Sequence, residues 1–242
     1  MRTARRRLAA ASLVLATAML AAMLPALPAG AAYKRGIDIS QYQNTVNWTQ
    51  VGNANVKFVI ARASSGDNYA DPQYASNRAG AAAESIPFGA YHYAKPNGTT
   101  QDAVDEANFF VDTATPASGD IIPVLDLEQT GGLSRGRLED WVAAWLNRVE
   151  NRTGVKPMIY TSPYFWQTAM GNTTRFARRK FPLWIAHWDV RRPTVPANNW
   201  SGHGWTFWQY SDCGSVPGAG NSQGCVDLDR YRFNMFGRVL IN

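Results

Sequence analysis

Cysteine is scarce in this chain, which has only Cys213 and Cys225 among its 242 residues. Neither has the C-x-x-C spacing or the adjacent histidines of a zinc or redox site, and no H-E-x-x-H run occurs. The sequence therefore predicts a protein that needs neither a metal nor another cofactor.

Linkers and internal repeats are also lacking. No Pro/Ser/Gly-rich stretch separates modules, and the one long apolar run lies at the N-terminus. The remaining chain of about 210 residues is long enough for one large core. We therefore expect a single domain over residues 33–242, without an appended binding module, and a monomer.

Residues 1–32 have the pattern of a secretory signal peptide. Four arginines precede an Ala/Leu/Met-rich run over residues 8–24, and Ala29-Gly30-Ala31 offers a small-x-small cleavage site. An uncleaved membrane anchor is the alternative, but the apolar run is short and a cleavage site follows. Cleavage predicts a secreted, extracellular protein that has no contact with the membrane.

Removal of residues 1–32 changes the net charge, and export changes what the two cysteines imply. The removed segment carries four of the 24 basic residues and none of the 18 acids, which leaves a net charge of +2 and no argument for nucleic-acid binding. A basic cluster remains at residues 175–180, with Arg191 and Arg192 near it, and it fits either an anionic polymer or a solvated helix face. In an exported chain, the lone pair Cys213 and Cys225 predicts a disulfide.

Short apolar runs alternate with helical patterns along the chain. Eight runs have the length and composition of strands, at residues 35–40, 57–63, 87–93, 121–128, 156–161, 182–188, 205–210 and 225–229. Helical patterns cover residues 72–84, 100–113 and 134–152, with shorter ones near 46–52, 163–170 and 174–180. Residues 188–205 and 210–225 have only loop character. The sequence therefore predicts an irregular eight-stranded TIM-like β/α barrel with helices missing near the C-terminal strands.

Acidic residues fall at the ends of these predicted strands. Asp126 and Glu128 are two residues apart in a buried run, so strand geometry places both on one face. An isolated pair of this kind also fits a strand that runs into a polar loop. Asp38, His92 and Asp227 lie at three other strand ends, and barrel enzymes build their sites from such ends. The joint occurrence favours a site, and paired carboxyl groups are what glycosidic bond cleavage requires.

Seven short blocks spread over residues 35–232 form an ordered series. They begin with Gly36-Ile37-Asp38-Ile39-Ser40 and continue with Phe58-Val59-Ile60-Ala61-Arg62-Ala63, Gly89-Ala90-Tyr91-His92-Tyr93-Ala94, Pro123-Val124-Leu125-Asp126-Leu127-Glu128, Tyr160-Thr161-Ser162-Pro163, Trp208-Gln209-Tyr210-Ser211 and Val226-Asp227-Leu228-Asp229. In this order they resemble the glycoside hydrolase family 25 lysozymes. One block is a weak signal, whereas seven in the family's order are a specific one.

The resemblance implies a secreted N-acetylmuramidase on an irregular barrel that has lost some helices. Such an enzyme hydrolyses the β-1,4 bond between N-acetylmuramic acid and N-acetylglucosamine in bacterial peptidoglycan, and retains the anomeric configuration. The resemblance places the catalytic acids at Asp38, Asp126, Glu128 and Asp227, with Glu128 as the proton donor. Crowding by the other three acids is expected to raise the pKa of Glu128. Asp126 then acts either as the nucleophile or as the group that orients the substrate's N-acetyl amide.

Further residues are predicted to contact the substrate. Tyr91, Tyr160 and Trp188 lie at strand ends, where aromatic rings can stack on sugars, and Gln209 lies in a matched block. His92 fits either a hydrogen bond to the acids or a core position. The family's second block usually reads Lys-Ala-Thr-Glu-Gly, whereas this chain has Arg62 in place of the lysine and Ser65 in place of the glutamate. Arg62 keeps the positive charge, but arginine and lysine donate hydrogen bonds in different geometries.

Three functions are consistent with these residues. The first is an active muramidase. The second is a non-catalytic wall-binding protein on the same barrel, although such a protein has no need for four clustered acids. The third is a glycosidase for another amino-sugar polymer, such as chitin.

Overall fold

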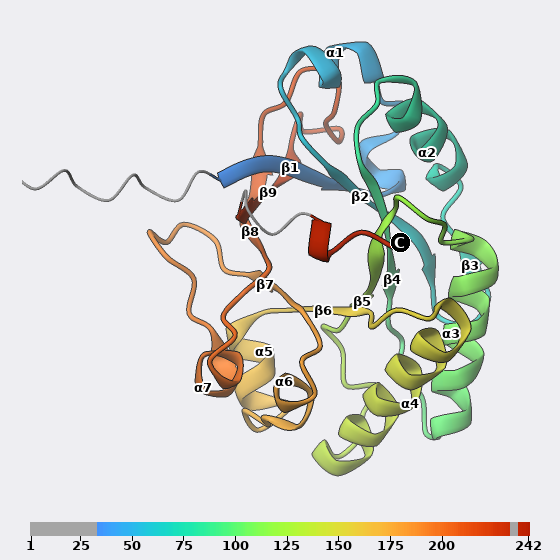
Figure 1. The fold of residues 1–242 in the computed structure, drawn as a ribbon, viewed down its shortest axis with the longest axis vertical. Coiled ribbons are helices and arrows are strands. Elements are labelled where there is room, and N and C mark those ends of the chain that lie inside the picture. Colours follow the sequence, from blue (N-terminus) through green and yellow to red (C-terminus); the bar gives the residue numbers. More distant parts are fainter. Residues whose placement is uncertain (1–32, 233–236) are drawn as a thin grey trace, which may run out of the picture. The chain divides into compact units, whose positions relative to one another are not determined.

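The predicted strands form one sheet that closes on itself in the computed structural model (Figure 1). The structure describes residues 33–232 and 237–242. The strands within them are β1 (Tyr33–Ile39), β2 (Val59–Ser65), β3 (Tyr69–Ala70), β4 (Phe88–Tyr93), β5 (Ile121–Asp126), β6 (Met158–Thr161), β7 (Leu183–Ala186), β8 (Phe207–Gly214) and β9 (Val226–Arg232). They lie in the order β1-β9-β8-β7-β6-β5-β4-β2-β3, and pairing of β1 with β2 closes an eight-stranded barrel, as predicted.

One strand runs against the direction that the alternating pattern predicts. Seven barrel strands pair in parallel where they meet one another, but β9 is antiparallel to both β1 and β8. The start of β9 therefore lies at the rim formed by the carboxyl ends of the other strands. In this register Asp227 is paired directly with Asp38.

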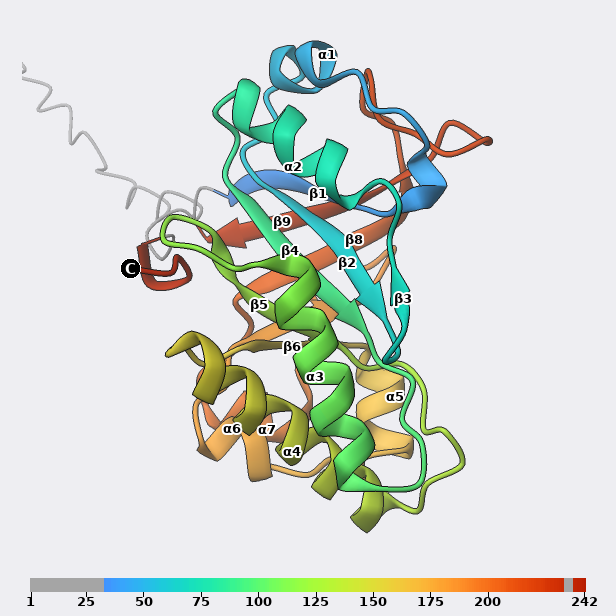
Figure 2. The same cartoon turned by 90° about the vertical axis from the view of Figure 1, so that its right-hand side faces the viewer.

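Helices cover the barrel unevenly. They are the 3₁₀ helix η1 (Gln41–Gln43) and the helices α1 (Trp48–Asn53), α2 (Tyr74–Ala83), α3 (Thr100–Ala114), α4 (Arg135–Thr153), α5 (Pro163–Thr168), α6 (Arg175–Arg178) and α7 (Pro196–Ser201). The long helices α3 and α4 pack side by side outside the barrel (Figure 2). No helix lies between β8 and β9 in the described chain, which confirms the expected loss of helices near the C-terminal strands.

The prediction that residues 188–205 form only a loop was incomplete. The short element α7 lies there, but its residues Ala197–Trp200 have φ between 51° and 55°, which makes it a left-handed turn. Such a turn has no right-handed helical periodicity, so the apolar pattern cannot reveal it. It is fixed by Trp200, which is buried and donates its indole N–H to the carbonyl of Phe181 at 2.7 Å.

Two apolar layers stabilise this architecture. One fills the barrel and includes Phe58, Val124 and Phe207, while the other lies between the barrel and its helices. The alternation of strand side chains separates the two layers. Gly36 allows the inner layer to close, because a Cβ at that position would lie 2.4 Å from the ring of Phe58.

No helix in the described part of the chain is both long and apolar enough to cross a bilayer. The predicted signal peptide, residues 1–32, lies outside the described residues.

Cys213 and Cys225 form a disulfide, as the sequence predicts. The bond joins the end of β8 to the residue that precedes β9, across a separation of 12 residues.

Replacing both cysteines with serine should lower the free energy of unfolding by about 3 kcal/mol, because the closed loop no longer restricts the unfolded chain. The expected decrease in Tm is roughly 6–12 °C for a domain of this size. Calorimetry on the oxidised protein and the double variant measures it. Alkylation without reduction should leave both cysteines of the exported protein unmodified, and two alkylated thiols would contradict the bond.

Candidate active site

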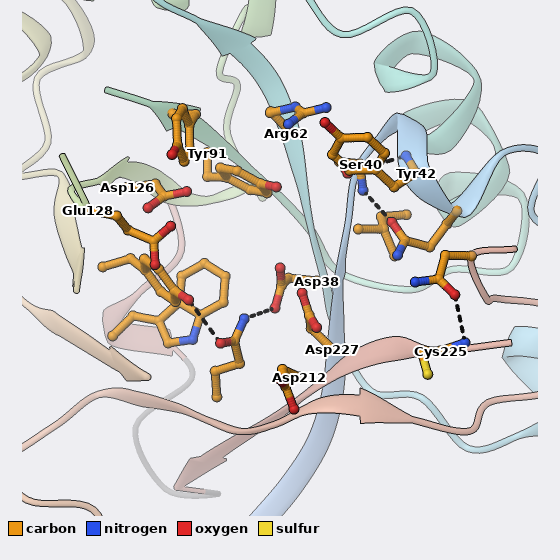
Figure 3. A pocket seen from close by; sticks show the side chains of 17 residues that line it. Asp38, Ser40, Tyr42, Arg62, Tyr91, Asp126, Glu128, Asp212, Cys225 and Asp227 are labelled. Carbon is orange, nitrogen blue, oxygen red and sulfur yellow. Dashed lines mark hydrogen bonds between the residues drawn. The ribbon is translucent and has the colours of Figure 1, made fainter. Parts of the chain in front are cut away.

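A pocket of about 280 Å³ opens at the barrel rim where the predicted acids meet (Figure 3). Asp126 and Glu128 lie on one side of it, and Asp38 and Asp227 lie across from them. The lining residues are Asp38, Ile39, Ser40, Tyr42, Gln43, Arg62, Tyr91, Tyr93, Asp126, Glu128, Tyr160, Trp184, Gln209, Asp212, Asn221, Cys225 and Asp227. The structure thus brings all four predicted acids into one pocket.

Each acid reaches the pocket from a defined place in the barrel. Asp38 lies near the carboxyl end of β1, and Asp126 is the last residue of β5. Glu128 lies two residues beyond β5, so the strand is shorter than predicted. The backbone stays extended there, since the N–H of Leu127 donates to the carbonyl of Tyr160 at 3.0 Å. Asp227 comes from the start of the antiparallel β9.

Asp126 and Glu128 form a coupled acid pair. Burial raises the pKa of Asp126 well above its usual range, and the charges of Glu128 and Asp38 add to the shift. Glu128 lies at the pocket mouth, and loss of hydration there raises its pKa as well. Because each ionisation works against burial and the second also works against repulsion, the pair keeps a proton above the ordinary pH range of a carboxyl group.

The cause of the shift at Glu128 differs from the expectation. Crowding by the other acids was expected to raise its pKa, but burial is the cause that the structure supports. Asp227 illustrates why, because burial, followed by the charges of Asp38 and Asp212, raises its pKa to about 9. A carboxyl group with that pKa is uncharged at neutral pH, so it cannot repel the charge of Glu128.

Asp38 is the centre of a second group of carboxyl groups deeper in the barrel. Burial raises the pKa of Asp38 well above its usual range, followed by the charge of Asp229. The protonated Asp227 hydrogen-bonds to Asp38, which favours the ionised form of Asp38. Asp229 is fully buried, accepts a hydrogen bond from the indole N–H of Trp184 at 2.8 Å, and also has a raised pKa, mainly through burial.

Asp227→Asn should make stability less dependent on pH. Between pH values of about 4 and 9 the unfolded state has lost the Asp227 proton that the folded state retains, so the free energy of unfolding falls as pH rises through this window. Asparagine does not titrate. The difference in Tm between the variant and wild type should therefore grow in favour of the variant from pH 4 to pH 9. Each kcal/mol of free energy of unfolding corresponds to about 2–4 °C. Parallel Tm curves for the two proteins would contradict the raised pKa.

Gln209 connects several predicted substrate-contacting residues. Its Nε2 donates to Asp38 Oδ2 at 2.8 Å, and its Oε1 accepts from the hydroxyl of Tyr160 and the indole of Trp188, each at 2.8 Å. Burial raises the pKa of Tyr160, as it does for Tyr91, so both hydroxyls stay protonated and can donate hydrogen bonds.

Trp188 does not line the acidic pocket itself. It is 42% exposed and lines a neighbouring hollow of about 600 Å³ together with Tyr164, which is 77% exposed. Glu128 lines both hollows, so they adjoin at the acid pair.

Arg62 reaches the pocket through the ordinary alternation of β2. Phe58 and Ile60 face the barrel interior, so Arg62 shares their face and lies beside Tyr91 at the pocket. The register of β2 against β4 shifts only after Arg62, so that Ser64 pairs with His92 and faces outward. The Nε of Arg62 pairs with Asp71 at 2.9 Å, and its guanidinium carbon lies 5.2 Å from the ring centre of Tyr42. Among the described residues that line this pocket, Arg62 is the one basic side chain.

The predicted role of His92 in substrate binding is wrong. His92 is fully buried on the outer side of β4, where it stacks on Trp145 at 5.6 Å. Its ring nitrogens lie 2.8 Å from Ser64 Oγ and 2.7 Å from Glu106 Oε2. Consecutive strand residues face opposite sides, so Tyr91 in the pocket already requires His92 to face the helices.

Several lining residues were not predicted. Tyr93 follows from the same alternation, since it shares the face of Tyr91. Tyr42 and Asp212 come from a short 3₁₀ helix and from the end of β8, where the sequence carries no such signal.

The arrangement has the features of a site for acid-assisted glycoside cleavage. A coupled acid pair can supply a proton to a leaving oxygen, and nearby carboxylates can stabilise positive charge that develops at a sugar ring. No group of three or more metal-ligating side chains lies close enough together to hold an ion among the described residues.

Comparison with known proteins agrees with this chemistry. Residues 37–219 match the model of the glycosyl hydrolases family 25. The chain belongs to this family. It is 36% identical to Lysozyme M1 from Streptomyces globisporus, over 86% of this chain and 70% of that protein. It is 34% identical to the N,O-diacetylmuramidase from Chalaropsis, over 77% of this chain and 92% of that protein.

A solved structure of the family has the same architecture. The bacterial lysozyme from Streptomyces coelicolor superimposes with a TM-score of 0.75 at 34% identity, covering 82% of this chain and 91% of its own. The protein is therefore a glycoside hydrolase of family 25.

Proposed function

We propose that the protein is a secreted lysozyme that hydrolyses the β-1,4 bond between N-acetylmuramic acid and N-acetylglucosamine in bacterial peptidoglycan. The observation that carries this proposal is the meeting of Asp38, Asp126, Glu128 and Asp227 in one rim pocket. Relatives named lysozyme and N,O-diacetylmuramidase support the substrate class. A signal peptide over residues 1–32 and a single catalytic domain over 33–242 complete the proposal.

Glu128 is the proton donor in this mechanism. It lies at the mouth of the pocket, where a glycosidic oxygen can approach, and its raised pKa keeps it protonated at higher pH than an ordinary glutamic acid. Its proton passes to the leaving oxygen as the bond to the anomeric carbon breaks. After the first product leaves, the Glu128 carboxylate accepts a proton from the water that attacks.

The anomeric configuration is retained through the substrate's own N-acetyl group. While Glu128 holds the proton of the pair, Asp126 is ionised beside it and lines the pocket. Its carboxylate can accept the amide N–H of an N-acetyl sugar and orient the carbonyl oxygen toward the anomeric carbon. Attack by this carbonyl gives a cyclic intermediate that water opens. Direct attack by Asp126 is the competing route.

Binding of the glycan uses the rings around the acids. Tyr91 and Tyr160 line the acidic pocket, while Trp188 and Tyr164 extend the surface on the other side of Glu128. Aromatic faces and fixed donors such as Arg62 suit sugar rings that carry amide and hydroxyl groups.

Lysis of purified bacterial walls, followed by turbidity beside a soluble chitin oligomer, tests the proposal. We expect clearing of the walls and little cleavage of chitin. Binding to walls without clearing would favour a non-catalytic wall-binding protein. Faster cleavage of chitin would favour a different amino-sugar polymer as the substrate.

A further inference from the structure

A second pocket lies on the outer face of the barrel, and its charge is opposite to that of the acidic pocket. It has a volume of about 530 Å³, and the described residues that line it include three arginines and one histidine but no acid. The lining residues are Tyr33, Arg191, Arg192, Pro193, Val195, Asn199, Gly202, His203, Gly204, Trp205, Trp208 and Arg230.

Its position follows from the uneven helical layer. Asp229 and Tyr231 face the barrel interior, so Arg230 between them faces outward, and Trp208 faces outward on the paired strand β8. No helix connects β8 to β9 in the described chain, so this part of the barrel wall has no such helix to cover it (Figure 1).

Aromatic rings hold Arg230 in place. Its guanidinium carbon lies 4.0 Å from the ring centre of Tyr210 and 5.2 Å from that of Trp208. Trp208 is itself fixed, because its indole N–H donates to the carbonyl of His187 at 2.8 Å. A stacked guanidinium loses little conformational freedom when it binds an anion.

Arg191 and Arg192 complete the positive pocket from the loop between β7 and α7. Both are exposed, and a hydrogen bond of 2.9 Å from the N–H of Thr194 to His187 Nδ1 holds the loop in its conformation. No carboxylate among the described residues forms an ion pair with Arg191, Arg192 or Arg230.

The other predicted basic cluster is different. Over residues 175–180, Arg175 pairs with Asp140 at 2.8 Å and Arg179 donates to Asn147. That cluster has polar partners on the protein surface. The three arginines of the outer pocket have no carboxylate partner among the described residues, so a bound anion would be the first group to neutralise them.

We propose that the outer pocket binds the phosphate groups of a polyol-phosphate chain. A chain with one negative charge in each repeat can offer a separate phosphate to each guanidinium group, whereas a single carboxylate pairs with only one guanidinium group. The exposed ring of Tyr33 offers an apolar surface for the polyol carbons. Resting on the proposed function, the pocket would hold the enzyme on a phosphate-rich wall polymer while the acidic pocket cleaves the glycan.

Calorimetric titration of the secreted Glu128→Gln protein with a glycerol phosphate oligomer of defined length, at low salt, tests this proposal. The oligomer should bind, and Arg191→Gln/Arg192→Gln should weaken binding by at least about tenfold. The matched control, Arg137→Gln/Arg178→Gln, removes two equally exposed charges outside the pocket and should change affinity much less. Arg230→Lys keeps the positive charge but removes the planar guanidinium group that stacks on the aromatic rings, and it should also weaken binding.

Several outcomes would overturn the proposal. They are absence of oligomer binding, equal losses in the two double variants, and tighter binding to phosphatidylglycerol vesicles than to the oligomer, which would identify a lipid headgroup as the ligand. Glycerol 3-phosphate alone should bind more weakly than the oligomer, and equal affinity would exclude a chain. Hydrolysis of a soluble muropeptide by Arg191→Gln/Arg192→Gln should equal that of wild type. The binding titration uses the Glu128→Gln protein and requires no hydrolysis. Its result therefore does not depend on whether the protein is a lysozyme.

Discussion

Replacing Glu128 with glutamine should abolish wall lysis while the fold stays intact. Glutamine keeps the size and the hydrogen-bonding capacity of the side chain but cannot donate a proton with the acidity that the leaving oxygen needs. The expected loss in kcat is about 10²–10⁴-fold, the usual contribution of a general acid. Turbidity loss on purified walls measures it, with circular dichroism and Tm as checks of folding.

A matched control separates catalysis from a general effect of charge. Glu150→Gln makes the same chemical change on α4, away from the acidic pocket, and should leave the rate at the wild-type level. A Glu128→Gln protein with more than about a tenth of wild-type activity would falsify the assignment of Glu128 as the proton donor.

The barrel could be predicted from the sequence because its strands are short buried runs separated by recognisable helices. The direction of β9 could not, since the run that contains Asp227 reads the same in either orientation. What decides it is the long loop without a helix before β9, which allows the chain to return antiparallel between β1 and β8. The resemblance names Asp227 as a site residue, and the antiparallel β9 brings it into the same pocket as the other three acids.

The pocket residues that lie on strands could be predicted from the alternation of strand side chains between the two faces of the sheet. Asp126 and Glu128 share the pocket because they are two residues apart, and the same rule excludes His92 once Tyr91 faces the pocket. The bulge that turns Ser64 away from the pocket has no such signature, because it depends on the register of β2 against β4. Burial is the main cause of the raised pKa values of the pocket acids, and the sequence does not reveal it because these residues become buried only when the barrel closes.

Replacing Asp126 with asparagine should lower kcat strongly and move the alkaline limb of the pH profile of kcat/KM to lower pH. In wild type the second ionisation of the acid pair occurs against the charge of the first, so the pair keeps its last proton to a higher pH than a single buried carboxyl group would. With asparagine at position 126 this repulsion is gone and only burial continues to raise the pKa of Glu128. The rate also falls, by about 10²-fold or more, because the carboxylate that orients the N-acetyl amide is lost.

The pH profile is measured on a soluble muropeptide, with Asp105→Asn on the exposed face of α3 as the control that should match wild type. A substrate whose N-acetyl groups are replaced by trifluoroacetyl groups separates the two retaining routes. If the carbonyl attacks, the weaker nucleophile should slow wild type greatly and slow Asp126→Asn in addition to its own defect. An unchanged wild-type rate on the fluorinated substrate would instead make Asp126 the nucleophile. An alkaline limb that stays in place in Asp126→Asn would show that the two carboxyl groups do not share a proton, and the electrostatic basis for Glu128 as donor would then rest on burial alone.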